Sequence, residues 1–162
     1  MNKNDSRENY DGDSFVPALI DRLSLTNNGE MNRNVFRKTV LRDLSWLLNC
    51  SNIEKELSLE NFSRVKRSVV NYGIPPLTGA NLTDSDLDFI ALELQKVVAY
   101  FEPRILEKTL KVSVTRNPDN GHNNYAHFRI EATYWFEPYP IDMVIRAQWD
   151  MDTGGVEIQE DK

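Results

Sequence analysis

The chain has 162 residues, of which 27% are charged and 40% hydrophobic, and its formal net charge at pH 7 is −6. This length suits a single domain that buries roughly two-thirds of the surface of the unfolded chain, so folding requires neither a disulfide nor a metal ion. The negative charge provides no general basic field for nucleic acid or for an anionic membrane, which favours proteins as partners.

The N-terminal residues and the cysteine content indicate the compartment. Residues 1–14 are polar, and no apolar run approaches the ~20 residues that a membrane span requires. Cys50 is the single cysteine and cannot form an internal disulfide, and no Cys/His pair has the spacing of a zinc site. We therefore expect a soluble intracellular protein with a flexible polar leader over 1–14 and one domain over 15–162.

In chain order, the first apolar repeats have helical spacing. Residues 15–23 are expected to form a short amphipathic helix, and 27–29 are loop formers that end it. A longer helix is predicted over roughly 32–48, where apolar residues follow a three-and-four rhythm. Cys50, just after this helix, is expected to be a buried or partly buried side chain rather than a nucleophile. The segment 51–62 is expected to be a loop with at most a short turn of helix.

The middle of the chain combines a non-helical segment with a second long helix. Residues 68–72 could finish a helix or form a strand, and Gly73 with the two prolines that follow it then enforces an extended segment. Thr83 is the predicted N-cap of the next helix, which carries an unbroken apolar stripe over 87–101. Pro103 ends this helix, because the residue before a proline is pushed out of the α region.

After Pro103 the apolar period changes from about 3.6 to 2. Four alternating strands are predicted over 110–115, 126–134, 141–149 and 156–158, separated by segments rich in Gly, Pro, Asn and Asp. Helices followed by a β-meander predict an α+β domain, in which N-terminal helices pack on one face of a C-terminal antiparallel β-meander.

Motifs for common enzymes are absent from the sequence. It contains no nucleophile elbow, P-loop or dinucleotide-binding glycine run, and His122 and His127 lie in or beside one hairpin turn, where surface roles are expected. Glu102 follows two aromatic residues and could act as the acid of a glycosidase. Arg104 argues against this role because it favours the ionised carboxylate, and the acids over 84–88 lie several helical turns away.

Two basic clusters could contact an acidic partner surface or could be solvated faces, and the second interpretation is favoured in an acidic protein. Aromatic residues do not interleave with them, which disfavours a nucleic-acid groove. The clusters consist of Arg33, Arg37, Lys38 and Arg42, and of Arg64, Lys66 and Arg67.

Four short motifs occur in the order known from one family. They are Leu19-Ile20-Asp21-Arg22-Leu23, Leu41-Arg42-Asp43-Leu44 with Trp46-Leu47-Leu48-Asn49, Ser68-Val69-Val70-Asn71-Tyr72-Gly73-Ile74-Pro75, and Phe101-Glu102-Pro103-Arg104. With these motifs the chain resembles the type VI secretion baseplate subunit TssE, which is similar to the wedge protein of contractile phage tails from which sheath assembly begins. The resemblance covers nearly all of the chain after residue 15. Thr153-Gly154 also matches the family, whereas Pro75-Pro76-Leu77 departs from its usual Pro-Asp-Leu.

The resemblance implies a structural protein with no enzymatic activity, in a cytoplasmic baseplate docked at the inner membrane. It implies that Glu102, Pro103 and Arg104 attach the chain to the baseplate core, and it implies no catalytic residue, cofactor or metal. The implied partners are wedge proteins of the TssF, TssG and TssK types and sheath proteins of the TssB and TssC types. A free sheet edge could receive an extended arm of a sheath subunit, and the sequence does not tell which outer strand is used.

Alternatives remain for the chain and for its motifs. A lysozyme-like cell-wall glycosidase is the second functional hypothesis, and an acidic adaptor unrelated to secretion is the third. In a structural interpretation of the triplet, Pro103 only stops the helix, while Glu102 and Arg104 pair with each other or with neighbouring chain. Under the connector hypothesis, Arg104→Glu should leave folding intact and abolish co-purification with wedge proteins. The motif Asn71, Tyr72 and Gly73 is expected to be structural, with Gly73 serving backbone geometry and Tyr72 packing.

Overall fold

The computed structural model describes residues 33–54, 56–75, 84–116 and 125–160. The expected leader over 1–14, the helix over 15–23 and the N-cap Thr83 lie outside this part of the chain, as does His122. The described residues form helices in the N-terminal part and a sheet in the C-terminal part, which confirms the predicted α+β class.

In the part of the chain that the structure describes, two long helices and three short ones precede the sheet or lead into it. The bounds are α2 Arg33–Leu48, α3 Ser63–Lys66, η1 Val69–Asn71, α4 Asp84–Phe101 and η2 Glu107–Thr109. The two long helices agree with the predictions, and α4 ends two residues before Pro103, as the restriction on residues that precede proline requires. The segment that could have been helix or strand is a single 3₁₀ turn, η1.

The sheet is an antiparallel meander whose four strands lie in chain order. Its strands are β1 Lys111–Arg116, β2 Tyr125–Tyr134, β3 Ile141–Asp150 and β4 Val156–Glu160. Burial alternates along β2 and β3, so that every second residue faces the helices and the others face away. β1 and β4 are therefore the two outer strands of the sheet.

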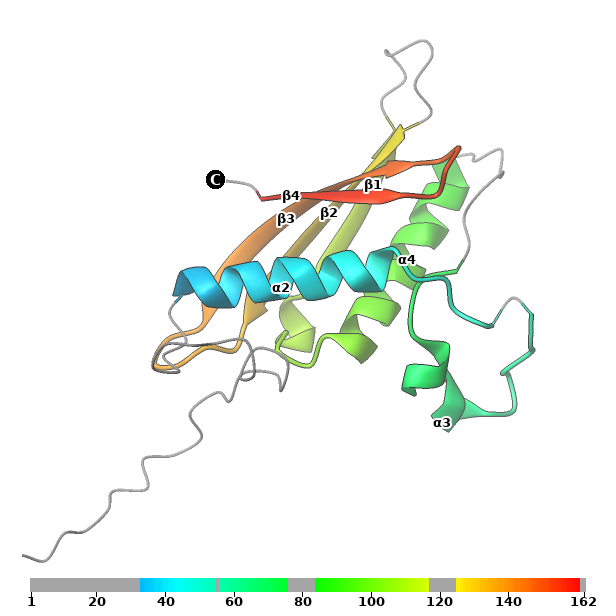
Figure 1. Cartoon of the computed structure of the whole chain (residues 1–162), viewed down its shortest axis with the longest axis horizontal. Helices are drawn as coiled ribbons and strands as arrows, with labels where there is room; N and C mark the ends of the chain where they lie inside the picture. The colour runs from blue at the N-terminus through cyan, green and yellow to red at the C-terminus, as the bar shows by residue number, and fades with distance from the viewer. Residues whose placement is uncertain (1–32, 55, 76–83, 117–124, 161–162) are drawn as a thin grey trace, which may run out of the picture.

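The core lies between the sheet and the helices. α2 packs beside β4 and α4 beside β1, both on the same face of the sheet (Figure 1). The largest fully buried side chains come from all of these layers: Phe36, Leu44, Leu47, Leu48, Leu94, Phe128, Ile130, Tyr134, Ile145 and Trp149. Burial of apolar area at ~25 cal/mol per Å² is the main term that holds the helices on the sheet.

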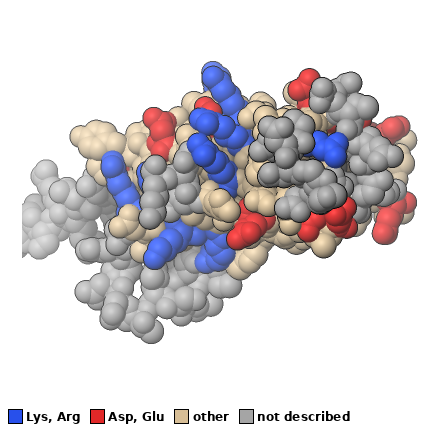
Figure 2. Space-filling model, turned by 90° about the horizontal axis from the view of Figure 1, so that it is seen from above, with Lys and Arg blue, Asp and Glu red and all other residues tan. Residues whose placement is uncertain are grey.

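The other face of the sheet is open and polar. Exposed basic residues stand on it at Lys111, Arg129 and Arg146, and Arg129 lies directly opposite Arg146 in the β2–β3 register. Figure 2, which views the molecule from above Figure 1, shows Lys and Arg side chains gathered toward the middle of this side. A hollow of about 390 Å³ on the same face is lined by His127, Arg129, Arg146 and neighbouring polar residues.

The expectation that Cys50 is buried or partly buried is wrong, because its side chain is exposed. α2 ends at Leu48, and the chain then leaves the core to pair with the segment around Ile74, where Ile74 N–H donates to Cys50 O at 2.8 Å. Cys50 is one of the residues that line a pocket near the β3–β4 turn. None of the helices in the described ranges is both long and apolar enough to span a membrane.

Candidate interaction site

The turn that follows α4 is fixed to the sheet by its backbone. Pro103 lacks an N–H and stops the helix, after which the Arg104 carbonyl accepts a hydrogen bond from the Trp135 N–H at 2.7 Å. Leu106 N–H then donates to Thr133 O at 2.9 Å. The triplet Glu102-Pro103-Arg104 is thus held at the end of β2 before any side-chain contact is considered.

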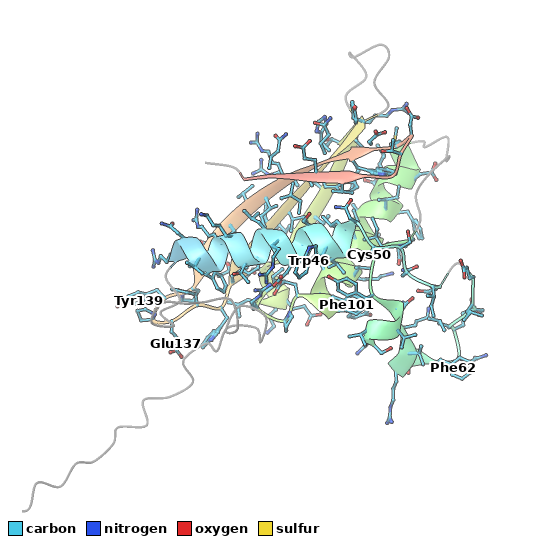
Figure 3. The ribbon with its side chains drawn as sticks, viewed as in Figure 1. Trp46, Cys50, Phe62, Phe101, Glu137 and Tyr139 are labelled. Carbon is cyan, nitrogen blue, oxygen red and sulfur yellow. The ribbon has the colours of Figure 1, made fainter. Side chains whose placement is uncertain are left out.

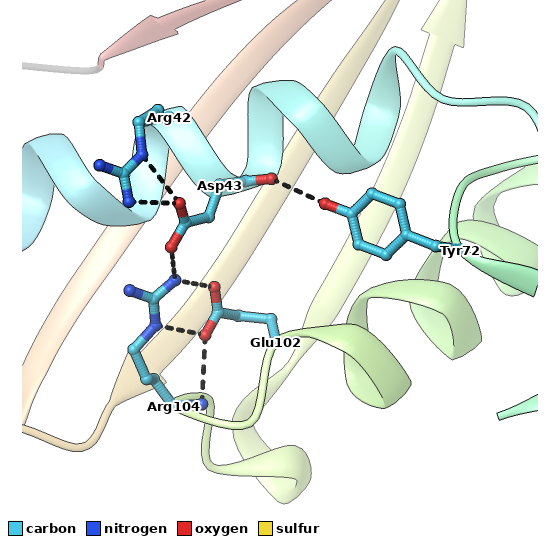
Figure 4. Close-up of polar contacts among 5 residues, drawn as sticks. All are labelled: Arg42, Asp43, Tyr72, Glu102 and Arg104. Atoms are coloured by element: carbon cyan, nitrogen blue, oxygen red, sulfur yellow. Dashed lines mark hydrogen bonds and ion pairs between the residues drawn. The ribbon is translucent and has the colours of Figure 1, made fainter. Parts of the chain in front are cut away.

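The side chains of the triplet enter an ion network with α2 (Figure 4). Arg104 Nε donates to Glu102 Oε1 at 2.5 Å, and Arg104 Nη2 binds the second oxygen of the same carboxylate. Arg104 Nη2 also donates to Asp43 Oδ2 at 2.8 Å, and Asp43 Oδ1 accepts from Arg42 at 2.8 and 3.0 Å. Two arginines and two carboxylates alternate along the network, so its formal charges cancel.

Burial decreases along this network from Glu102 to Arg42. The side chain of Glu102 is 3% exposed and that of Arg104 is 11% exposed, against 26% for Asp43 and 32% for Arg42. Burial disfavours the charged guanidinium, but the hydrogen bond and charge of Glu102, followed by those of Asp43, outweigh it and raise the pKa of Arg104. Arg104 therefore stays a cation, and it is the group that neutralises the buried Glu102.

Tyr134 lies below the network in the core. Its ring is fully buried, and its hydroxyl has no hydrogen-bond partner among the described residues. Burial raises the pKa of Tyr134 far above its usual value, the charge of Glu102 raises it further, and Arg104 opposes this. The hydroxyl is neutral at physiological pH, and the described residues give it no hydrogen bond in exchange for its lost hydration, which costs stability.

Gly73 in the second motif is required by a close backbone approach. Its φ is +119°, and a Cβ at this position would lie 2.3 Å from Cys50 O. The approach lets the segments around Ser51 and Ile74 form a parallel bridge. Gly73 therefore serves backbone geometry, as expected, because the Cys50 carbonyl just after α2 leaves no room for a side chain.

Tyr72 and Asn71 connect the same segment to the two long helices and to α3. The Tyr72 ring packs edge-on against Phe101, with centroids 5.3 Å apart, and its hydroxyl lies 3.5 Å from Asp43 O. Asn71 is buried and donates from Nδ2 to Lys66 O at 3.2 Å. Asp43 therefore contacts the second motif through its backbone carbonyl and the ion network through its side chain.

The comparisons with known proteins bear on this arrangement. The model of one family, described as baseplate wedge protein gp25, matches residues 34–139. The chain belongs to this family. No curated protein and no solved structure matches the chain significantly.

The span that matches the wedge family includes the second motif and the Glu-Pro-Arg triplet. It runs from the start of α2 to just before β3 and therefore includes Asn71–Gly73 and Glu102–Arg104. Membership supports a structural role in a baseplate together with other baseplate components, and it is consistent with the absence of enzymatic activity. The comparison gives no support to the glycosidase hypothesis.

Sequence reasoning identified the triplet but missed its partner on α2. Asp43 lies 61 residues before Arg104, so no local spacing relates the two. Its position inside the motif Leu41-Arg42-Asp43-Leu44 was the available signal, since Asp43 is the one acidic residue of a helix that carries four basic ones. Arg42, which sequence reasoning grouped with a basic cluster, forms an ion pair with Asp43.

The surface next to the network is aromatic and cationic. Trp46, one turn after Arg42, is 48% exposed, and the Arg42 guanidinium lies 4.8 Å from its ring centroid. Figure 3 shows Trp46 on α2, well separated from Phe62 on the α3 side of the molecule. Pro103 is exposed at the turn itself. Trp and Arg are residue types that protein interfaces favour.

Proposed function

We propose that the chain is a TssE-type subunit of a type VI secretion baseplate, which joins wedge subunits and initiates assembly of the contractile sheath. The observation that carries the proposal is the family match over residues 34–139, together with a four-stranded sheet that has two outer strands. In this proposal the chain is a cytoplasmic part of a baseplate docked at the inner membrane. It contacts wedge proteins of the TssF, TssG and TssK types and sheath proteins of the TssB and TssC types.

An outer strand supports the proposal of sheath initiation. The outward N–H and C=O groups of an edge strand can pair with an extended segment of another chain, which gives affinity through main-chain bonds and register through alternate side chains. A subunit that receives sheath arms in this way provides a template for the first ring of the sheath.

Attachment to the wedge is assigned to the turn with Glu102, Pro103 and Arg104. Glu102 and Arg104 bind each other and α2, so their part in an interface is to hold the turn and Asp43 in place. The groups available to a partner are Pro103 and the neighbouring Arg42–Trp46 pair. Glu102 and Arg104 are positioning residues in this proposal, and Pro103 makes the contact.

The test is co-purification of the chain with wedge proteins after substitution of Trp46. Trp46→Ala removes an exposed ring and should leave the midpoint of thermal unfolding within a few degrees, because exposed side chains contribute little to stability. We expect it to reduce wedge recovery at least tenfold. Phe62→Ala is the matched control, since Phe62 is 59% exposed on the other side of the molecule. Equal recovery of wedge proteins by both variants would remove this surface from the interface.

A further inference from the structure

The direction of the backbone shows which groups the outer strand β4 presents at the free edge of the sheet. Asp150 N–H donates to Gly155 O at 2.9 Å, so the backbone of Gly155 faces β3. Successive residues of a strand direct their N–H and C=O groups to opposite sides. The N–H and C=O groups of Val156, Ile158 and Glu160 therefore point away from β3. A strand that adds to β4 would have to pair with these residues.

The first of these positions on β4 is already occupied by a side chain. Asn49 accepts from Val156 N–H at 2.9 Å with Oδ1 and donates to Val156 O at 2.8 Å with Nδ2. Its Nδ2 also donates to Ser45 O at 2.9 Å, which fixes the amide to the last turn of α2. The carboxamide therefore takes the place that a residue of an added strand would take, and β4 is closed at its N-terminal end.

The same reasoning defines the outward groups of β1. Thr133 receives a hydrogen bond at its carbonyl from Leu106 N–H and donates its N–H to Thr109 Oγ1, so its backbone faces the β1 side of β2. By alternation the backbone groups of Glu131, Arg129 and His127 also face β1. Their register partners on β1 are Lys111, Ser113 and Thr115. The residues between them, Val112 and Val114, direct their backbone groups outward. Among the residues that the structure describes, no hydrogen bond closes the edge at Val112 or Val114 as Asn49 closes β4.

Side chains at the β1 edge are also suited to receive a strand. Val112 and Val114 point to the helix face and pack against the core, yet both are only partly buried. An added strand with apolar residues opposite them would complete their burial. On the open face the edge begins with Lys111, which lies opposite Glu131 of β2, and the carboxylate of Glu131 is paired with Arg129 at 2.6 Å, so that Lys111 is the cation at the edge itself. An acidic residue of the incoming strand would be attracted there.

We propose that β1, and not β4, is the edge that receives the arm of a sheath subunit. The proposal rests on the proposed function of sheath initiation and adds to it the strand and the chemistry of the arm. The arm is an extended segment with small or β-branched apolar residues on the helix side and at least one acidic residue beside Lys111 on the open side. Asn49 keeps β4 from competing for the same arm.

Two matched proline variants test the choice of edge. Val114→Pro and Ile158→Pro each remove one outward N–H from an outer strand without removing a bond between strands, and both replace a partly buried β-branched residue. Thermal unfolding checks that each variant folds. Purified baseplates that carry each variant are then mixed with sheath subunits, and the sheaths attached to baseplates are counted by electron microscopy.

We expect at least a tenfold loss of attached sheaths for Val114→Pro and no loss for Ile158→Pro. Loss for Ile158→Pro, alone or together with Val114→Pro, would overturn the choice of β1. Sheath formation at the wild-type level with both variants would overturn strand addition as the mode of contact. Failure of the proposed function is distinguishable from these results, because then even wild-type baseplates would not increase the number of sheaths over baseplates that lack the chain.

A charge reversal keeps the proposal testable should a proline variant fail to fold. Lys111→Glu changes an exposed side chain at the start of β1, and Glu157→Lys changes an exposed side chain on β4. The β1 reversal should reduce attached sheaths severalfold and the β4 reversal should not. Equal effects of the two reversals would contradict an acidic arm at β1.

Discussion

Replacement of Arg104 by methionine tests whether the ion network holds α2 to the turn after α4. The substitution keeps an unbranched chain of similar reach and removes the charge. It leaves Glu102, whose side chain is 3% exposed, without its cation in the interior of the protein. Removal of one partner from a buried pair costs about 3–5 kcal/mol of the free energy of unfolding, because the remaining charge is uncompensated.

The size of this effect is measurable by heat and by denaturant. For a domain of this length ~1 kcal/mol corresponds to about 2–4 °C in the midpoint, so Arg104→Met should lower the midpoint by about 6–20 °C. Glu102→Gln combined with Arg104→Met removes both charges and should be less destabilised than Arg104→Met alone. Arg42→Met is the control, since its side chain is 32% exposed and such pairs contribute only ~0–1 kcal/mol.

Two results would refute this reasoning. One is an Arg104→Met protein that unfolds within about 1 kcal/mol of the wild type, which would mean that the network does not stabilise the fold. The other is a double variant that loses more stability than Arg104→Met, which would mean that Glu102 stabilises the protein without its arginine. Urea titrations of the wild type and the three variants at one pH provide all four free energies.

The network also changes what Arg104→Glu can show. From sequence alone this reversal is expected to leave folding intact. In the structure it would bring a third carboxylate to Glu102 and Asp43, so we expect loss of stability together with any loss of wedge binding. Substitution of the exposed Trp46 is therefore the cleaner test of the interface.

Further substitutions test the backbone contact, the buried hydroxyl and the edge cap. Gly73→Ala should destabilise by at least about 1–3 kcal/mol in urea titrations, because its Cβ would meet Cys50 O, whereas Gly155→Ala should change little. Tyr134→Phe should be neutral or stabilising by up to about 1–3 kcal/mol, since the hydroxyl has no partner in the described part of the chain. Burial in the folded state raises the pKa of Tyr134 above its usual 10.0, so the unfolded state loses the proton first. The stability of the wild type should therefore fall above that pH. The phenylalanine variant should lose less stability between pH 8 and pH 11. Asn49→Ala should cost about 1–2 kcal/mol and promote edge-to-edge association, detectable by sedimentation velocity.

Local signals were sufficient for most of the fold. The apolar stripe of α4 and the proline after it give both the helix and its end, and the change to period 2 gives the strands. The location of the turn with Glu102 and Arg104 followed from the same signals. These features depend on residues close in sequence, which is why one sequence suffices to predict them.

Features that depend on distant residues were not predictable. Asp43 and Arg104 are 61 residues apart, and Asn49 and Val156 are 107 residues apart, so neither contact leaves a pattern in the local sequence. Cys50 was expected to be at least partly buried because free cysteines usually are. Its exposure follows from the pairing of its carbonyl with the segment at Ile74, again a contact outside the local sequence.

Sheath formation on purified baseplates tests the central claim most directly. Baseplates assembled with and without the chain are mixed with the same concentration of sheath subunits, and electron microscopy records how many sheaths form and where they begin. The account predicts sheaths that start at the baseplate and require the chain. Equal numbers of baseplate-attached sheaths in its absence would contradict it.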